Sequence, residues 1–277
     1  MKRMRSDVSR GFAAVNGAQL YYEDTGSGIP VVLIHGLCLN LRMWDAQLDA
    51  LAQRFRVIRY DVRGFGKSSV PDKPFRHADD LRALSDYLDA PAAHVVGLSM
   101  GGRIALHYAL LYPEGIRSLV LVDSALDGFD WHDSWNTSLD AIEARGRRDG
   151  AEAANRMWLN HELFTATRER PECSAALAEI LRYDSGWIWL NASLARGIHP
   201  PARTRLAEIR VPTLVIVGER DLPDFHAIAD ILAAGIPNAT KVEIPRVGHM
   251  SNMEDPAAFN YLLMEFLTAG AKGEQRV

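Results

Sequence analysis

The fold is decided by one stretch near the middle of the chain, which reads His94-Val-Val-Gly-Leu-Ser-Met-Gly-Gly102. Its apolar first half predicts a buried strand, and the residues that follow have helical spacing up to Pro113. Gly97, Ser99 and Gly101 therefore form the pattern G-x-S-x-G between a strand and a helix. In this context the pattern predicts a sharp turn that presents the Ser99 hydroxyl, with glycines where a side chain would collide with neighbouring elements. The alternative, a glycine-rich turn with a surface serine, needs no such flanking elements.

The composition of the whole chain is that of an ordinary globular protein. Its 277 residues are 48% hydrophobic and 24% charged, which suffices for one large core or for a core with an inserted subdomain. A net charge of -4 argues against nucleic acid or an anionic membrane as a partner. No apolar run is long enough to cross a bilayer, and the basic N-terminus is not followed by the apolar segment of a secretory signal. The two cysteines, Cys38 and Cys173, make no disulfide framework, so a cytoplasmic location is expected.

Strand and helix patterns alternate along most of the chain. Strands are expected at residues 19–24, 30–36, 55–60, 95–98, 118–123, 211–218 and 241–244. Helices are expected at residues 41–53, 77–90, 103–111, 225–234 and 255–268, the last with Pro256 in its first turn. Residues 1–15 are expected to be a loose leader. Unbroken apolar strands that alternate with helices predict an α/β fold with a mostly parallel sheet.

The alternation stops over residues 125–200, where valine-rich runs are absent. We expect a helical cap here, inserted between two parts of the core at residues 1–124 and 201–277. The cap carries five of the six tryptophans, namely Trp131, Trp135, Trp158, Trp187 and Trp189. These side chains either line an aromatic substrate pocket or attach the cap to the core, and both interpretations remain open.

A serine hydroxyl becomes a nucleophile only when a base takes its proton, and histidine has a pKa near the working pH. In a site of this kind the partners follow along the chain in the order serine, acid, histidine. His249 fits that order best, because it lies in a loop between the last predicted strand and the closing helix. For the acid we choose Asp221, which follows the penultimate strand. Asp224, which we interpret as a cap of the next helix, and Asp123, which ends another strand, remain alternatives.

The negative oxygen that develops during attack on a carbonyl needs backbone donors. One is expected from the amide of Met100, and the other from the amide of Leu37, in the loop after His35-Gly36. We interpret His35 as a structural side chain whose ring bonds the backbone and fixes this loop, with a catalytic part as the alternative. Cys38 has no neighbouring base or helix terminus to activate it, and we interpret it as a small wall of the substrate pocket.

Other patterns in the chain do not predict a cofactor or a metal. Gly26-Ser-Gly28 precedes a strand, whereas a dinucleotide fingerprint follows one. Gly64-Phe-Gly-Lys-Ser68 resembles the end of a P-loop but lacks the first glycine of that motif. No cysteine and histidine cluster has the spacing of zinc ligands. The sequence carries no sign of an oligomeric state.

Together these residues resemble the α/β-hydrolase superfamily with an inserted cap. The landmarks that match in order are His35-Gly36, Asp61-Val-Arg-Gly-Phe-Gly-Lys-Ser68, Gly97-Leu-Ser-Met-Gly-Gly102, Asp221 and Gly248-His249. The resemblance implies a mostly parallel sheet of about eight strands with flanking helices, a Ser99–His249–Asp221 triad and no cofactor. Within the superfamily, Leu41-Arg-Met-Trp-Asp-Ala-Gln47 looks like the 3-oxoadipate enol-lactonase group and its esterase relatives. Ser99 departs from the aspartate nucleophile of the haloalkane dehalogenases.

The expected function is hydrolysis of a small-molecule carboxylic ester or lactone through an acyl-enzyme on Ser99. Three alternatives remain open. Two use the same triad, either to hydrolyse a carbon–carbon bond or to let peroxide replace water in a cofactor-free perhydrolase. The third is a receptor that keeps the pocket and binds its ligand without turnover.

Overall fold

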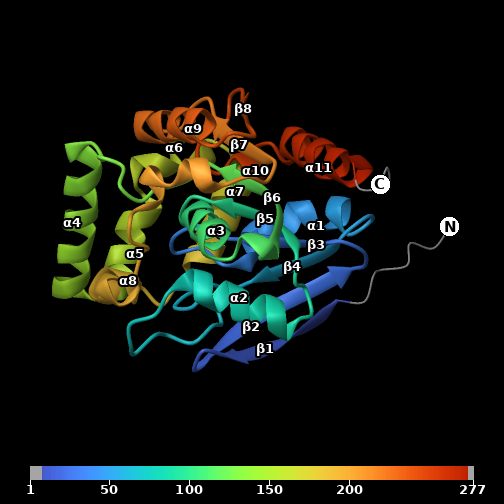
Figure 1. Cartoon of the computed structure of the whole chain (residues 1–277). Helices are drawn as coiled ribbons and strands as arrows, with labels where there is room; N and C mark the ends of the chain where they lie inside the picture. Colours follow the sequence, from blue (N-terminus) through green and yellow to red (C-terminus); the bar gives the residue numbers. More distant parts are fainter. Residues whose placement is uncertain (1–7, 274–277) are drawn as a thin grey trace.

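The computed structural model describes residues 8–273, which form an eight-stranded sheet covered by helices (Figure 1). The strands are β1 (Ser9–Val15), β2 (Ala18–Gly26), β3 (Pro30–Ile34), β4 (Arg56–Tyr60), β5 (Ala93–Leu98), β6 (Ile116–Val122), β7 (Thr213–Gly218) and β8 (Ala239–Ile244). They lie in the order β1-β2-β4-β3-β5-β6-β7-β8. β2 pairs antiparallel with β1 and β4, and the other pairs are parallel. The predicted α/β fold with a mostly parallel sheet is confirmed.

The helices that pack around the sheet follow the strands in the predicted order. They are α1 (Asp45–Leu51), α2 (His77–Tyr87), α3 (Met100–Leu111), α9 (Pro223–Gly235), α10 (Ser251–Glu254) and α11 (Pro256–Gly273). α3 packs on β5, β6 and α2, α9 packs on β7 and β8, and α1 packs on β4 and α11. Short 3-10 helices lie at Leu41–Trp44 (η1), Pro113–Gly115 (η2), Glu162–Phe164 (η3), Ala192–Leu194 (η4), Ala202–Thr204 (η5) and Leu206–Glu208 (η6). Among residues 8–273, no helix combines the length and the apolar character that crossing a membrane requires.

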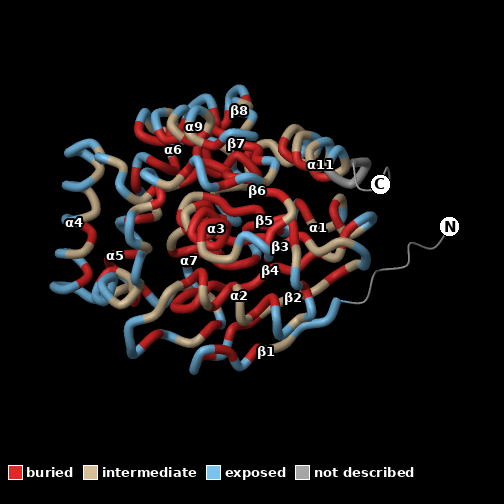
Figure 2. The backbone as a smooth tube through the Cα atoms, in the orientation of Figure 1, coloured by how far each residue is buried: buried red, intermediate tan, exposed pale blue. Residues whose placement is uncertain are grey.

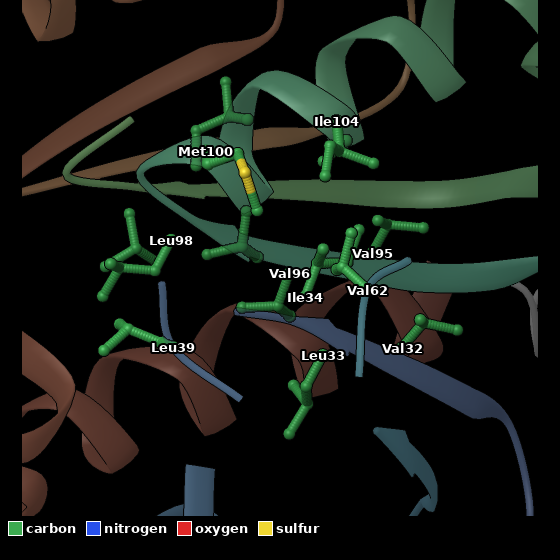
Figure 3. Close-up of a cluster of buried hydrophobic side chains, with 14 of the residues drawn as sticks. Val32, Leu33, Ile34, Leu39, Val62, Val95, Val96, Leu98, Met100 and Ile104 are labelled. Atoms are coloured by element: carbon green, nitrogen blue, oxygen red, sulfur yellow. The ribbon is translucent and has the colours of Figure 1, made fainter. Parts of the chain in front are cut away.

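The central strands form the middle of the hydrophobic core. Every residue of β5 and of β7 is buried (Figure 2), as expected for parallel strands with helices on both faces. Figure 3 shows aliphatic side chains of β3, β5 and the start of α3 packed in one cluster. Because β3, β5, β6 and β7 are parallel neighbours, the loops after these strands meet at one edge of the sheet.

The prediction of a loose leader over residues 1–15 is wrong for Ser9–Val15, which forms β1. This strand pairs with β2 along its whole length. The turn between them is Asn16-Gly17, whose φ angles of 48° and 74° both lie in the left-handed region. Asn-Gly between two strands is a strong hairpin signal, because these residues tolerate that conformation, and the sequence interpretation missed it. Residues 1–7 lie outside the described residues.

Between β6 and β7 the chain leaves the sheet. It forms the helices α4 (Asp133–Asp149), α5 (Ala151–Leu159), α6 (Thr165–Arg168), α7 (Pro171–Leu181) and α8 (Ile188–Asn191). α4 contacts α5 and α8, and Figure 1 shows it at the edge of the molecule, while α7 packs on η1. Trp187 lies directly over Gly64, which has a φ of 95° and where an added side chain would collide with the indole ring. Trp187 therefore attaches this helical segment to the core, which is one of the two roles expected for the five tryptophans.

Candidate active site

Ser99 lies between the end of β5 and the start of α3, as the G-x-S-x-G pattern predicts. Its φ of 57° and ψ of −115° lie outside the regions that a serine normally occupies. Its amide donates a 2.9 Å hydrogen bond to the Val122 carbonyl, which holds the turn against β6. A side chain at Gly97 would collide with the backbone of Gly101, and one at Gly101 would collide with the Ile34 carbonyl. The two glycines are therefore required by close backbone approach, and the strained turn is held by its surroundings.

His249 lies in the loop after β8 and is almost completely buried, at 2% exposure. Its Nδ1 lies 2.8 Å from Oδ2 of Asp221, and the ring of Phe225 packs against it with 4.4 Å between centroids. Burial lowers the pKa of His249 to about 4, with the charges of Asp123 and Glu254 acting in the opposite direction. The imidazole is therefore neutral near pH 7. Its Nε2 has no hydrogen-bond partner within residues 8–273, so this nitrogen is the one able to accept a proton.

Asp221 and Asp123 lie beside each other, but the structure pairs His249 with Asp221. The second oxygen of Asp221 accepts a 2.8 Å hydrogen bond from the Leu222 amide. Asp123 follows β6 with a φ of 43°, and its carboxyl oxygens accept hydrogen bonds from the Gly218 amide at 2.8 Å and the Ser251 hydroxyl at 2.7 Å. Burial and the neighbouring Asp221 carboxylate raise the pKa of Asp123 well above its usual range. Burial likewise raises the pKa of Asp221 well above its usual range, so the two neighbouring carboxyl groups favour one shared negative charge.

The same three side chains are also the strongest candidates for metal ligands in the described part of the chain. One ligand atom each of Asp123, Asp221 and His249 lie within 4.8 Å of one another. Apart from Nε2 of His249, their polar atoms already bind each other or the amides and hydroxyl described above, so hydrogen bonds account for this arrangement.

Asp224 does not cap the helix that begins near it, which corrects the sequence interpretation. It lies inside the first turn of α9, where Leu222 is the N-cap residue. Its carboxylate accepts a 3.2 Å hydrogen bond from the amide of His132, just before α4. Asp224 therefore connects α9 to the segment between β6 and β7.

The loop after β3 lies beside Ser99. A Cβ added to Gly36 would lie 3.5 Å from the Ser99 Cβ, so this glycine leaves room next to the hydroxyl. Leu37 is half-buried in this loop, and Met100 is the first residue of α3. Neither amide donates a hydrogen bond to another residue in the range 8–273. Both N–H groups are thus free to bind an oxygen atom of a ligand.

His35 fixes the same loop through hydrogen bonds of its ring to the backbone, as the sequence interpretation expected. Its Nδ1 lies 2.8 Å from the Gly36 carbonyl, and its Nε2 accepts a 2.9 Å hydrogen bond from the Val62 amide. Both ring nitrogens are therefore engaged with the backbone, which assigns the proton to Nδ1. Burial lowers the pKa of His35 to about 4, while the hydrogen bond to Gly36 acts in the opposite direction.

Cys38 is fully buried and has a φ of 59°. Burial and the nearby Asp184 carboxyl raise the pKa of its thiol well above the usual range. This cysteine is therefore an unreactive part of the core. Cys38 and Cys173 are both free thiols, as predicted.

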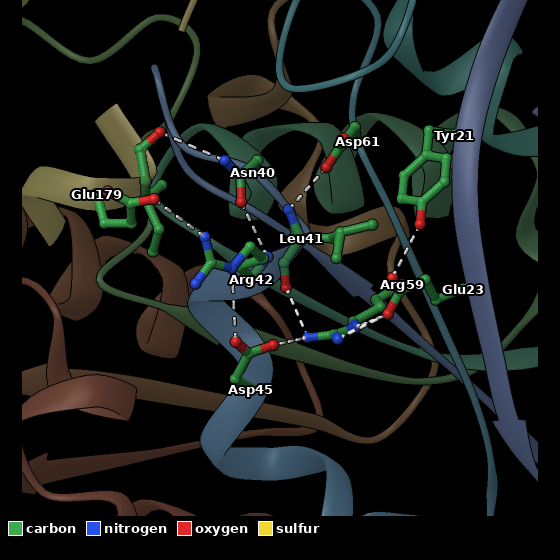
Figure 4. Close-up of polar contacts among 10 residues, drawn as sticks. Tyr21, Glu23, Asn40, Leu41, Arg42, Asp45, Arg59, Asp61 and Glu179 are labelled. Carbon is green, nitrogen blue, oxygen red and sulfur yellow. Dashed lines mark hydrogen bonds and ion pairs between the residues drawn. The ribbon is translucent and has the colours of Figure 1, made fainter. Parts of the chain in front are cut away.

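The glycine-rich loop after β4 surrounds an internal carboxylate. Asp61 accepts a 2.9 Å hydrogen bond from the Leu41 amide (Figure 4) and a 2.7 Å hydrogen bond from the Lys67 amide. A side chain at Gly66, where φ is 54°, would collide with this carboxylate. Arg59 donates a 3.1 Å hydrogen bond to the Leu41 carbonyl on the other side. The loop thus supports the backbone around η1, and Gly66 leaves room for this internal contact.

The five predicted pocket tryptophans fall into two aromatic groups. Trp131 and Trp135 are half-buried, stack with 4.9 Å between centroids, and both contact Phe225, the residue that packs on His249. Trp158 and Trp189 continue this group inward and are buried. Trp187 instead packs with Phe65 and Phe75. Phe225 therefore links Trp131 and Trp135 to His249 through direct ring contacts.

Glu254 is the residue that the sequence interpretation missed. Its side chain is 0% exposed, although it is an acidic residue in a short polar helix. It accepts hydrogen bonds from the amides of Gly248 and Met250, on either side of His249. The only signal in the sequence was an acidic residue close after the histidine, which does not by itself indicate burial.

Comparison with known proteins agrees with this geometry. The family model described as alpha/beta hydrolase fold matches residues 29–256. 3-Oxoadipate enol-lactonase 2 from Acinetobacter baylyi is 29% identical over 236 residues, which are 83% of this chain and 85% of that protein. The crystal structure of the enol-lactonase from Burkholderia xenovorans LB400 matches with a TM-score of 0.82 and 30% identity, covering 93% of this chain and 100% of that one. A thermophilic esterase from Thermogutta terrifontis, with malate bound, matches with a TM-score of 0.81 and 30% identity over 95% of this chain and 99% of that one. This chain belongs to the alpha/beta hydrolase fold family.

Proposed function

We propose that this protein hydrolyses a small-molecule carboxylic ester or lactone, with Ser99 as the nucleophile. One observation carries the proposal. A serine held in a strained turn at the end of β5 shares the sheet edge with a buried histidine, which is bonded to Asp221 at 2.8 Å and has its other nitrogen free. These are the three groups that acyl transfer through a serine requires.

In the proposed reaction, Ser99 Oγ attacks the carbonyl carbon of the substrate and its proton passes to Nε2 of His249. Asp221 accepts a hydrogen bond from Nδ1–H of the His249 imidazolium and stabilises its positive charge. The amides of Met100 and Leu37 donate hydrogen bonds to the carbonyl oxygen as it becomes negative. The C–O bond to the alcohol portion then breaks, and that oxygen takes the proton from His249. An acyl ester on Ser99 remains.

The second half of the reaction returns the enzyme to its starting state. A water molecule gives its proton to Nε2 of His249 and attacks the acyl carbon. The bond to Ser99 Oγ breaks, Ser99 recovers a proton from His249, and the carboxylic acid leaves. With a lactone substrate, the alcohol and the acid are parts of the same product molecule.

The choice of an ester or lactone rests on the three relatives described above, which are named as enol-lactonases and an esterase. We further propose that residues 125–200 form a cap over the site and that Trp131 and Trp135 contribute to the substrate pocket. Their stacked rings reach His249 through Phe225, which supports this role. The cytoplasmic location and the absence of a nucleic-acid partner stay predictions from composition.

Hydrolysis of p-nitrophenyl esters of graded acyl length tests the proposal. The wild type and Ser27→Ala, which removes an exposed serine in a distant turn, are expected to release p-nitrophenol at equal rates. Ser99→Ala is expected to reduce kcat by at least about 10³-fold. Equal turnover by Ser99→Ala would refute the proposal. Absence of wild-type turnover at every length would favour the carbon–carbon hydrolase or the receptor, whereas a rate increase that requires peroxide would favour the perhydrolase.

A further inference from the structure

The carboxylate of Glu254 is surrounded by four donors. Its Oε2 accepts a 2.7 Å hydrogen bond from the Gly248 amide and lies 3.3 Å from Nη1 of Arg170. Its Oε1 accepts hydrogen bonds from the Thr167 hydroxyl at 2.7 Å and from the Met250 amide at 3.3 Å. Two of these donors are the backbone amides immediately before and after His249.

A carboxylate is retained in a fully buried position only when hydrogen bonds and opposite charge replace its lost hydration. Glu254 meets this condition through the four donors, and each hydrogen bond to the charged group restrains the donor in return. The amide of Glu254 also donates a 2.9 Å hydrogen bond to the Met250 carbonyl, which closes the turn around His249. The backbone on both sides of the histidine is therefore held by one side chain.

The other two donors come from the segment between β6 and β7. Thr167 is a fully buried residue of α6, and Arg170 lies just after this helix. Arg170 also donates a 2.5 Å hydrogen bond to the Arg246 carbonyl at the start of the histidine loop. Glu169 forms an exposed ion pair with Arg220, next to Asp221. Residues 167–170 thus contact both the loop that carries the histidine and the loop that carries its acid.

We propose that Glu254 is a positioning residue that sets the placement of His249, and that it makes this placement depend on Thr167 and Arg170 in the segment between β6 and β7. This inference rests on the proposed function, because it assigns His249 the role of the base. An apolar residue at this position would leave the four donors unpaired.

Electrostatics give the proposal a signature that a purely structural role lacks. The charged and titratable groups that act on His249 are Asp221, Asp123 and Glu254, with His161 farther along the same aromatic group. The negative charge of Glu254 raises the pKa of His249 against the effect of burial. Removal of that charge should therefore lower the pKa of the imidazole and move the acid limb of the rate profile to lower pH.

The test compares Glu254→Gln with Glu208→Gln, which neutralises an exposed carboxylate paired with Arg205. Glutamine keeps the size of the side chain but loses the charge and one acceptor. We expect Glu254→Gln to lower kcat about tenfold with KM within about twofold, and to shift the acid limb of kcat/KM downwards. Glu208→Gln is expected to match the wild type in kcat, in KM and in the acid limb of kcat/KM. An unchanged kcat together with an unchanged acid limb in Glu254→Gln would overturn the proposal.

Thr167→Val and Thr167→Ser test the link to the inserted helices, and they keep the proposal testable if Glu254→Gln does not fold. Valine removes the hydroxyl donor at constant shape, while serine retains it. We expect a several-fold loss of kcat in Thr167→Val and recovery in Thr167→Ser. Equal kcat in both variants would show that the histidine loop does not depend on this contact.

A readout without substrate separates this inference from the proposed function. The NMR titration of the His249 ring protons, assigned with His249→Asn, measures the imidazole pKa directly. If Ser99→Ala shows that the proposed reaction is wrong, a lower His249 pKa in Glu254→Gln still supports the placement of the charge. An identical titration in the two proteins overturns the inference even when Ser99-dependent turnover is present.

Discussion

Acid should destabilise this protein through His35, because the folded structure uses the neutral form of that ring. Nε2 must lack a proton to accept the 2.9 Å hydrogen bond from the Val62 amide, and the ring is fully buried. The pKa of His35 is about 4 in the folded chain, against 6.5 for an unperturbed histidine. Below pH 6.5 the unfolded chain therefore binds a proton that the folded chain excludes. Stability is retained above that pH and is lost as the pH falls towards 4.

The size of the effect follows from the shift in pKa. One pKa unit corresponds to about 1.4 kcal/mol, so the full shift is worth about 3 kcal/mol of unfolding free energy, most of which is lost between pH 7.5 and 4.5. This is a large fraction of the stability of a typical domain, which is about 5–15 kcal/mol.

Urea denaturation of the wild type and of His35→Gln, each at pH 7.5 and pH 4.5, measures this contribution. Glutamine cannot titrate, so the variant should lose about 2–3 kcal/mol less than the wild type between the two pH values. The buried His249 is present in both proteins, so its contribution cancels in the difference, and that of His77 cancels apart from its electrostatic coupling to His35. Equal pH dependence in the two proteins would show that His35 is not the neutral hydrogen-bonded ring described above.

Further substitutions give distinct results. Asp221→Asn should lower kcat in the ester assay by about 10³–10⁴-fold, as the same change does in serine proteases. Asp123→Asn should lower kcat by about tenfold or less, because the amide oxygen can still accept the hydrogen bond from Gly218. Similar losses in both variants would contradict the pairing of His249 with Asp221. Gly101→Ala should destabilise the fold by about 1–3 kcal/mol or more, because its methyl group collides with the Ile34 carbonyl, and an unchanged thermal midpoint would disprove that contact. Phe225→Ala, at a side chain 1% exposed, should lower the unfolding free energy in urea by about 3–5 kcal/mol, and a loss below about 1 kcal/mol would mean that the aromatic group repacks.

The central sheet and the position of Ser99 were predictable because local patterns determine them. Apolar runs such as residues 30–34 identify buried parallel strands, and G-x-S-x-G between a strand and a helix identifies the turn. The order of elements then places a histidine and an acid at the same edge of the sheet. The choice of Asp221 over Asp123 was harder, because both residues follow strands that end there.

The parts that the sequence did not reveal depend on contacts between distant residues. Thr167 lies 87 positions before its partner Glu254, and no pattern near either residue announces that hydrogen bond. The N-terminal hairpin is a different case, because the Asn16-Gly17 signal is local and was overlooked. Asp224 shows a third case, where a carboxylate near a helix start binds the distant amide of His132 instead of the helix. Local sequence patterns predict helices and strands well, whereas the hydrogen-bond partners of buried polar side chains depend on the tertiary structure.

The uneven distribution of tryptophan makes the intrinsic fluorescence of this protein a probe of one segment. Five of the six indoles lie in residues 131–189, and the remaining one, Trp44, is buried against Phe259 in the core. Intrinsic fluorescence of the native chain therefore reports mainly on the inserted helices, without any label. The stacked and half-buried Trp131 and Trp135 make the emission sensitive to changes in the water around Phe225 and His249. Stopped-flow emission can thus separate rearrangement of these helices from the chemical step on Ser99.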